Sequence, residues 1–386
     1  MLIRRVEAFA VKLPADVAYL GPLPDASTTP DGYHIRPPWR SLYSSRYETT
    51  LVQVEADNGT TGWGEALAPV GPEITRDIID LLIGPRLVGQ RATAPRPVSA
   101  SARDLMRERG HLVGHQADAL AAVDTALWDL AARLAHRPLV EVLGGSFRST
   151  VPTYVSGLPL PDDAGRADLA RTWAQRGATG IKLHLGHGVE TDLDTVRAVQ
   201  HSAPQLRIAV DAHWAYSVTD ALRLASGLER LGGWFLEAPL APEDIDGHAE
   251  LVRRTAVPVA IGETLRNRYE FTQWLDARAL RIAQPDVART GVTELMAIAE
   301  LCAARHVPVA PHHSVGLGVS LAAGVTVSAA VENLTAFEYQ PTSVEVGAEI
   351  LSAPLHVEAD SIHVPRGEGL GIDVDLDVVA RLVKES

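Results

Sequence analysis

The sequence predicts an α/β fold, in which a barrel of eight parallel strands alternating with helices carries a smaller α+β capping domain. Three observations support this. The chain has 386 residues, 46% of them hydrophobic, enough for a large barrel and a second unit. A β-then-α pattern fills residues 1–145. From Val151 onward, short apolar strands that end in polar residues alternate with amphipathic helices at a spacing of 22 to 29 residues.

Residues 1–145 form the predicted capping domain. Residues 3–12 and 48–56 alternate between apolar and polar, as strands do, and Asp57-Asn58-Gly59 supplies a hairpin turn before a partner strand at 61–65. The connection 18–46 is long and rich in Pro, Gly, Ser and Tyr, which is typical of a functional flap or of a disordered segment. Its mixed aromatic and charged residues favour a flap that covers a substrate.

Helical periodicity follows over 74–136. One apolar face is formed by Leu120, Val123, Leu127, Leu130 and Leu134. Asp118 is expected to cap this helix and Pro138 to end it.

Residues 146–345 contain the repeat that predicts a TIM-like (β/α)₈ barrel. The eight candidate strands begin at Val151, Gly180, Arg207, Trp234, Pro258, Leu280, Val307 and Leu334. A doubly wound sheet would rarely repeat so evenly eight times. The last segment, 346–386, is expected to return to the capping domain.

Three carboxylates end neighbouring barrel strands: Asp211 the third, Glu237 the fourth and Glu263 the fifth. The spacing is regular, since 237 − 211 = 26 and 263 − 237 = 26. Active sites of such barrels lie at the carboxyl ends of the strands, so these acids should face one mouth. Acids at strand ends also cap helices, but three in register would repel one another without a hard cation, and oxygen ligands favour Mg²⁺.

Candidate bases end the remaining strands. They are Lys182 and His184 on the second strand, His213 two residues after Asp211, Asp286 on the sixth, His312 on the seventh and Glu338 on the eighth. Asp286 beside His312 would orient the imidazole and raise its basicity. His313 should point away from the mouth, and Cys302 should lie in the core.

Composition excludes several classes of partner. The net charge of −13 and the absence of a basic block argue against nucleic acid and anionic membranes. One cysteine excludes an internal disulfide, and the most apolar tract, 319–331, is too short to span a bilayer. The first residues contain no apolar run of signal-peptide length. We expect a soluble, acidic, cytoplasmic protein.

With these residues in view, the chain resembles the enolase superfamily, in its mandelate racemase-like subgroup. The segments TGWGE from Thr61, VDAHW, FLEAPL, IGET, QPDVARTG and VAPHH carry the resemblance, which covers nearly the whole chain. It implies that Asp211, Glu237 and Glu263 bind Mg²⁺, that Asp286 and His312 form a catalytic dyad, that Lys182 is the first lysine of the second-strand motif, and that Glu338 hydrogen-bonds the substrate carboxylate.

Two departures from the family pattern matter. The second-strand motif is often Lys-x-Lys, but here it is Lys182-Leu183-His184, which disfavours a racemase with a lysine opposite the dyad unless His184 takes over as base. The third strand ends in Asp211-Ala212-His213, where mandelate racemase-like members often have Asn at the last position. Asp-x-His is similar to the acid-sugar dehydratases of the galactonate, gluconate and mannonate type.

The resemblance therefore implies dehydration of a sugar acid to a 2-keto-3-deoxy acid. His312 would take the C2 proton and His213 would protonate the leaving C3 hydroxyl. Lys182 would offset the substrate charge, and His184 would act as a second acid/base or contact a sugar hydroxyl. The closest alternative is a racemase, epimerase or cycloisomerase on the same scaffold. A Schiff-base aldolase using Lys182 and a non-catalytic role are more remote.

Overall fold

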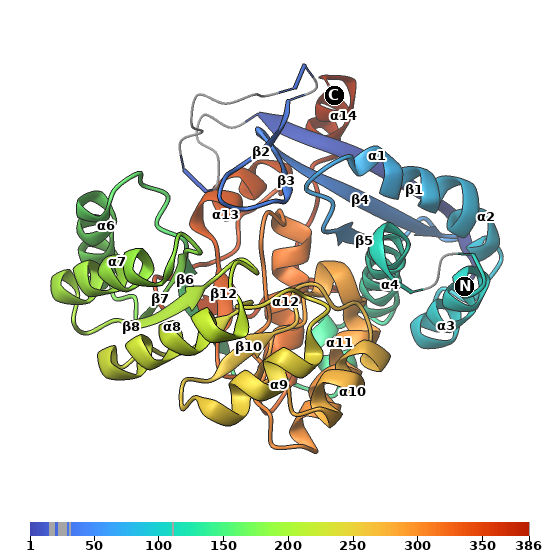
Figure 1. The fold of residues 1–386 in the computed structure, drawn as a ribbon. Helices are drawn as coiled ribbons and strands as arrows, with labels where there is room; N and C mark the ends of the chain where they lie inside the picture. The colour runs from blue at the N-terminus through green and yellow to red at the C-terminus, as the bar shows by residue number, and fades with distance from the viewer. Residues whose placement is uncertain (15–19, 22–28, 31, 110–111, 386) are drawn as a thin grey trace.

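A computed structural model describes residues 1–14, 20–21, 29–30, 32–109 and 112–385. The cap is built on an antiparallel sheet with strand order β1-β4-β5 (Figure 1). These strands are β1 (Ile3–Pro14), β4 (Arg46–Ala56) and β5 (Thr61–Ala66), so all three predicted cap strands are confirmed. A hairpin of β2 (Tyr33–Ile35) and β3 (Leu42–Ser44) occupies the end of the 18–46 connection. Residues 18–19, 22–28 and 31 of that connection lie outside the described residues.

The cap helices are α1 (Pro72–Ile78), a π-helical turn η1 (Ile79–Ile83), α2 (Gly84–Leu87), α3 (Pro95–Met106), α4 (Gly114–Leu134) and α5 (Leu139–Val142). Helix α4 packs against both β5 and the barrel helix α11 (Val287–Ala303), which explains why it is buried on nearly all sides from Ala117 to Ala132. The prediction that Asp118 caps this helix is wrong. The helix begins earlier, and Asp118 lies buried within it, 3.2 Å from Arg266 Nε.

The barrel is confirmed. Its parallel strands run in the order β11-β10-β9-β8-β7-β6-β12, with bounds β6 (Thr150–Ser156), β7 (Gly180–His184), β8 (Arg207–Asp211), β9 (Leu236–Glu237), β10 (Val259–Ile261), β11 (Ile282–Ala283) and β12 (Phe337–Tyr339). The predicted strand from Val307 is reduced to Val309, which bridges Ala283 on one side and Leu334 on the other and so completes the ring. Pro308 and Pro311 flank it, and proline cannot donate to a ladder.

A helix follows each barrel segment: α6 (Asp163–Gln175), α7 (Val189–Ser202), α8 (Val218–Leu231), α9 (Ile245–Arg254), α10 (Arg268–Asp276), α11, α12 (Gly318–Ala330) and α13 (Pro341–Gly347), the last continued by a 3₁₀ turn η2 (Ala348–Ile350). Inside the barrel, Tyr154 and Phe235 pack among small residues such as Ala209 and Ala260. The barrel is therefore a filled core, and only its carboxyl-terminal mouth is available for chemistry.

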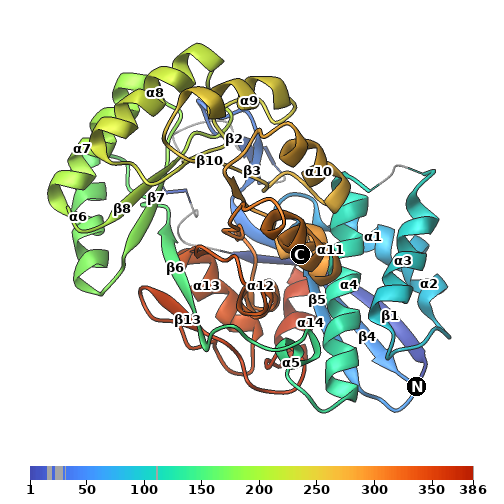
Figure 2. The ribbon, with the colours of Figure 1, turned by 90° about the horizontal axis from the view of Figure 1, so that it is seen from below.

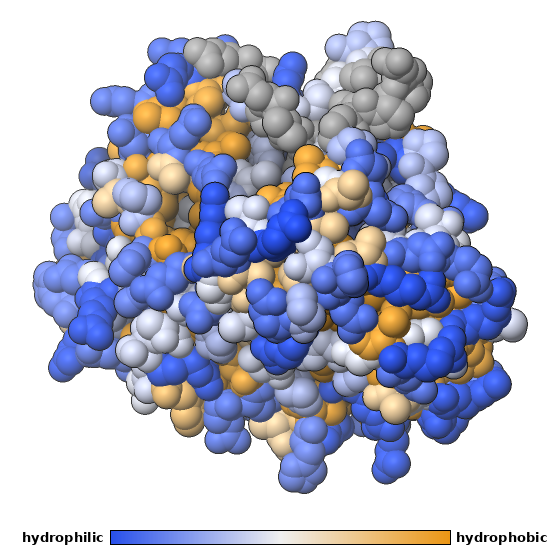
Figure 3. Space-filling model, turned by 90° about the vertical axis from the view of Figure 1, so that its left-hand side faces the viewer, coloured by the Kyte–Doolittle hydropathy of each residue, from blue (hydrophilic) through white to orange (hydrophobic). Residues whose placement is uncertain are grey.

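The C-terminal segment contacts both parts of the molecule. Strand β13 (Ser361–His363) pairs antiparallel with β6 (Figure 2), and helix α14 (Leu376–Glu385) packs on β1 of the cap (Figure 1). We retain 1–145, 146–345 and 346–386 as a proposed division of the chain. No helix in the described part of the chain is long and apolar enough to cross a membrane. The face seen in Figure 3 is mostly hydrophilic, with apolar areas broken up by polar side chains.

Buried carboxylates join the cap to the barrel. Glu65 of β5 accepts hydrogen bonds from the backbone N–H groups of Leu317 (2.6 Å) and Ser320 (2.7 Å) where α12 begins. On α4, Asp124 accepts from the N–H of Thr293 of the barrel helix α11 at 2.8 Å, and Asp129 accepts from the N–H of Leu370 of the C-terminal segment at 2.7 Å. Since a charged acceptor strengthens a hydrogen bond, these contacts fix the cap on the barrel.

An ion-pair cluster at the same junction leads to a stability prediction. Glu294 of α11 pairs with Arg103 of α3 and, at 2.8 Å, with Arg268 at the start of α10. Burial opposes ionisation of Glu294, but the hydrogen bonds from Arg268 and the charge of Arg103 outweigh it, so the pKa of this carboxyl lies below its ordinary value. A depressed folded-state pKa means stability that is present above the unfolded-state pKa and lost as the pH falls through the folded-state pKa.

Glu294→Gln should therefore lower the free energy of unfolding by about 1–3 kcal/mol at pH 7. The difference from the unchanged protein should shrink below about pH 4.5 as the carboxylate becomes protonated. Urea unfolding at pH 7 and pH 4 measures this. Glu300→Gln, on the exposed side of the same helix, is the control and should change little. Equal stability of Glu294→Gln and the unchanged protein at pH 7 would contradict the stabilising role of the Glu294 ion pairs.

Candidate active site

The predicted acids and bases meet at the carboxyl-terminal mouth of the barrel. Strand register puts His184, Asp211 and Glu237 side by side at the ends of β7, β8 and β9. A cavity of about 260 Å³ opens between this mouth and the cap. Its polar lining includes Lys182, His184, Asp211, His213, Glu263, Arg289, His312 and Glu338 from the barrel, and Tyr43, Ser44 and Arg46 from the cap.

Lys182 lies at the bottom of this cavity and is almost fully buried. Its Nζ is 2.8 Å from Glu237 Oε1 and 2.7 Å from Glu338 Oε1. Burial favours the neutral amine, but these two carboxylates hold the pKa of Lys182 well above its usual value. The site therefore contains a permanent cation between two acids.

The three predicted metal ligands, Asp211, Glu237 and Glu263, lie close together in a region where negative charge is in excess. Burial and the neighbouring acids raise the pKa of Glu237 to about 8, in spite of the pairing with Lys182. Burial also works against ionisation of Asp211, but the facing imidazole of His213 holds the pKa of Asp211 well below its ordinary value. A divalent cation would relieve this excess, and carboxylate oxygens are the ligands that Mg²⁺ prefers. The donor set therefore fits Mg²⁺.

The three acids are evenly spaced in the sequence, but they are not equivalent in the structure. One donor atom each from Glu237, Glu263 and His312 lies within 4.8 Å of the other two. Asp211 lies beside them, with Oδ2 4.0 Å from Lys182 Nζ and 3.3 Å from His213 Nδ1. The structure thus brings the three acids to one mouth, with Asp211 turned toward the histidine that follows it.

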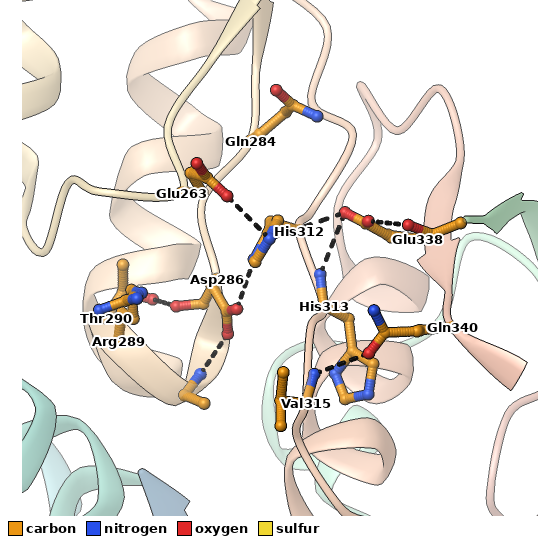
Figure 4. Close-up of polar contacts among 12 residues, drawn as sticks. Glu263, Gln284, Asp286, Arg289, Thr290, His312, His313, Val315, Glu338 and Gln340 are labelled. Atoms are coloured by element: carbon orange, nitrogen blue, oxygen red, sulfur yellow. Dashed lines mark hydrogen bonds and ion pairs between the residues drawn. The ribbon is translucent and has the colours of Figure 1, made fainter. Parts of the chain in front are cut away.

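His312 is held by carboxylates on three sides (Figure 4). Its Nδ1 lies 2.7 Å from Asp286 Oδ2, and its Nε2 lies 3.1 Å from Glu263 Oε2 and 4.0 Å from Glu338 Oε2. Burial favours the neutral ring, but Glu338, Asp286 and Glu263 raise the pKa of His312 well above its ordinary value. These carboxylates therefore favour the protonated ring, and Asp286 fixes its orientation. A cation bound by Glu263 would offset this effect and favour the neutral ring that a general base needs.

Glu338 is anchored at the opposite side of the cavity floor. Its Oε1 accepts a hydrogen bond from Ser156 Oγ at 2.5 Å, and its Oε2 accepts one from Tyr154 Oη at 3.3 Å. Ser156 Oγ also lies 3.2 Å from His184 Nε2. Burial lowers the pKa of His184 to about 4, so this ring is neutral at pH 7.

His213 follows the end of β8 in a left-handed conformation with φ 47°. Its ring stacks on Trp39 of the cap, with ring centroids 4.2 Å apart, and Trp39 Nε1 donates a 2.7 Å hydrogen bond to the carbonyl of Leu185. Although burial works against protonation, Asp211 raises the pKa of His213. Trp39 of the cap thus forms one wall of the site and packs against His213 of the barrel, a histidine that can donate a proton when it is protonated.

Several residues at the site were not predicted, among them Gln284, Trp39 and Tyr43. Gln284 follows directly after β11, and its Nε2 donates a 2.6 Å hydrogen bond to Glu237 Oε2. Trp39 and Tyr43 come from the irregular 18–46 connection, where no periodicity indicates their orientation. Of the other histidines considered, His313 is buried against Phe337.

Comparison with known proteins agrees with this geometry. Residues 165–378 match the family model described as enolase C-terminal domain-like. Residues 25–144 match the model of the mandelate racemase/muconate lactonizing enzyme N-terminal domain. The two matches together span most of the chain, and they correspond to the barrel and the cap.

Similar proteins include enzymes of both predicted classes. The chain is 32% identical to D-galactarolactone cycloisomerase of Agrobacterium fabrum, over 88% of this chain and 92% of that one. It is 30% identical to D-galactonate dehydratase of Ralstonia nicotianae, over 89% and 90%. A solved structure of an enolase superfamily member from Agrobacterium tumefaciens superposes with a TM-score of 0.94, at 32% identity and 98% coverage of both chains.

Proposed function

The chain belongs to the enolase superfamily, with the cap of the mandelate racemase/muconate lactonizing enzyme group, and on that premise we propose that it dehydrates a sugar acid to a 2-keto-3-deoxy acid in a Mg²⁺-dependent reaction. The proposal rests on one observation: the same cavity is lined by two histidines that each pair with a carboxylate. His312 pairs with Asp286 and would act as the base, and His213 pairs with Asp211 and would act as the acid.

Binding of the substrate carboxylate is the first role of the site. We assign it to the space above Lys182, whose ammonium offsets the substrate charge. Asp211, Glu237 and Glu263 would hold Mg²⁺, which when bound would supply the positive charge that stabilises the carboxylate as the α-proton leaves. Gln284 keeps Glu237 oriented by its hydrogen bond to Oε2. His184 is neutral and faces Ser156, which suits it for contact with a sugar hydroxyl.

The chemistry is a β-elimination carried out by two histidines. His312 takes the proton from C2, and Asp286 and Glu263 stabilise the imidazolium that results. The electron pair of the C2–H bond forms the C2–C3 double bond as the C3–O bond breaks. His213 gives its proton to the departing hydroxyl, so that water leaves. The enol that remains tautomerises to the 2-keto acid.

The remaining hydroxyls of the substrate have a place beyond His184. A second cavity of about 410 Å³ shares Leu20 and His184 with the first and is lined by Arg36, Trp39 and Arg166. We propose that this space and the cap hairpin recognise the distal end of the sugar acid.

Cycloisomerisation is the second candidate, because a cycloisomerase is among the relatives and the same base would begin that reaction. A Schiff-base mechanism is disfavoured, because a lysine nucleophile must be neutral and Glu237 and Glu338 keep Lys182 protonated. We further propose a cytoplasmic homo-oligomer that acts on small carboxylates.

A screen of acid sugars with Mg²⁺ tests the function. Semicarbazide detection of 2-keto acids should find at least one substrate, and ¹H NMR in D₂O should show solvent deuterium at C3 of the product. Lys182→Met is the negative control. A product with the same mass as the substrate, from which no water is lost, would establish the isomerase alternative instead. Deuterium at C2 only would indicate a racemase or epimerase, and a ring formed or opened without loss of water would indicate a cycloisomerase. No turnover and no exchange with any acid in the library would contradict the proposal.

A further inference from the structure

A second group of metal-binding side chains lies far from the mouth of the barrel, on the C-terminal hairpin that ends in β13. His356, Glu358 and His363 each place one donor atom within 4.8 Å of the other two. His363 Nε2 is 3.1 Å from Glu358 Oε1, and His356 Nε2 is 3.9 Å from the same oxygen. The two imidazole rings are stacked, with centroids 4.0 Å apart and planes 12° apart, and both Nε2 atoms lie on the side of Glu358 Oε1. Binding of one cation by all three side chains therefore requires rotation of an exposed imidazole about its side-chain bonds.

The hairpin backbone explains why these three side chains share one face. Val357 pairs with Ile362, His363 N–H donates to the His356 carbonyl at 3.0 Å, and Glu358 N–H donates to the Ser361 carbonyl at 2.8 Å. His356 and His363 are thus directly opposite each other, and Glu358 is two residues along the strand on the same side. Ile362 lies on the other face and is fully buried. The ligands are held in place by sheet pairing, and only their side chains have to adjust.

The geometry points to a binding site for a borderline divalent cation, of which Zn²⁺ is the best match, formed by His356, Glu358 and His363 and open to water in the fourth position. Two imidazole nitrogens and one carboxylate form a recurrent zinc ligand set, with a water in the fourth position. Ligand atoms around a tetrahedral zinc lie about 3.3 Å apart, as bonds of about 2.0–2.1 Å require. The separations of 3.1 and 3.9 Å are close to that value. Mg²⁺ prefers oxygen ligands and is disfavoured here.

Zinc at this position would close the hairpin across its open face. Because β13 pairs with β6, the first strand of the barrel, a closed hairpin would hold the C-terminal segment on the barrel. The site lies on the hairpin outside the catalytic cavity, so this inference is independent of the reaction proposed above. Binding to the folded state alone should raise the melting temperature.

Calorimetric titration of tag-free protein with ZnCl₂, in saturating Mg²⁺ to occupy the barrel site, tests the inference. The unchanged protein should bind one more equivalent of Zn²⁺ than His363→Ala, and its Tm should rise more when zinc is added. Glu358→Gln lies outside β13 and should show the same loss. His136→Ala is the matched control, because His136 pairs with Glu368 (3.0 Å) in an exposed pair of only two ligands.

Two variants, His363→Ala and Glu358→Gln, are used so that the test still gives an answer if one of them folds poorly. Circular dichroism checks each fold, and Glu358→Gln decides the question if His363→Ala loosens β13. Equal zinc stoichiometry in the unchanged protein and Glu358→Gln would overturn the inference, whether or not the protein dehydrates sugar acids.

Discussion

Replacing His312 by Asn should abolish both dehydration and exchange of the C2 proton with D₂O. The ring lies between Asp286 and Glu263, at 2.7 and 3.1 Å, and is the most basic imidazole that faces the cavity. Because we propose this ring as the base that takes the C2 proton, its removal should stop both reactions, and loss of a positioned base typically costs about 10²- to 10⁴-fold in rate. Semicarbazide assays measure dehydration, and ¹H NMR of substrate recovered from D₂O measures exchange.

Replacing His213 by Asn should affect dehydration and C2 proton exchange differently. If His213 only protonates the departing hydroxyl, dehydration should fall by about 10²-fold or more while exchange at C2 stays measurable. His306→Asn is a matched control, because His306 is exposed and has φ 58°, a conformation that Asn tolerates. The reverse pattern would exchange the two roles. Exchange that survives in both variants would assign the base to His184 and favour an isomerase.

Glu237→Gln should remove Mg²⁺ binding and activity while the fold stays intact. Glu237 is the central acid of the proposed triad, and the loss of affinity should exceed the roughly 10- to 100-fold that removal of an outer-shell partner typically costs. Its pKa of about 8 indicates that burying this charge is unfavourable. A neutral amide of the same shape should therefore leave the melting temperature of the Mg²⁺-free protein nearly unchanged.

Two measurements make the Glu237 test specific. Mg²⁺ should raise the Tm of the unchanged protein and leave that of Glu237→Gln unaffected. Glu243→Gln, an exposed carboxylate on the same β9–α9 connection, is the control and should respond to Mg²⁺ like the unchanged protein. Unchanged turnover in Glu237→Gln would contradict the metal assignment.

Much of the fold was predictable because barrel strands repeat at a nearly constant spacing. The same regularity places Asp211, Glu237 and Glu263 at one edge, since parallel strands end on the same side of the barrel. The seventh segment departs from a regular strand because two prolines remove donors, and the start of α4 was misplaced because a buried, ion-paired Asp118 looks like a cap in the sequence.

The sequence predicts a flap at 18–46, but it does not predict which side chains of that connection line the site. The stacking of Trp39 on His213 joins residues 174 positions apart, and nothing in an irregular loop indicates where an indole will lie. Gln284 was in view as part of QPDVARTG, but its role depends on which oxygen of Glu237 lacks a partner. That is a property of the three-dimensional arrangement of both strands.

The buried carboxylates Glu65 and Asp124 also limit how the cap can move. Swinging the whole cap about a hinge would break the hydrogen bonds that they accept from Leu317, Ser320 and Thr293 of the barrel, at about 1.5–3 kcal/mol for each bond to a charged group. Among the described residues, the β2–β3 hairpin contacts the barrel through Trp39, whose indole N–H donates to the Leu185 carbonyl and whose ring stacks on His213 and His187. We therefore propose that substrate enters by movement of this hairpin, with the rest of the cap as its fixed frame.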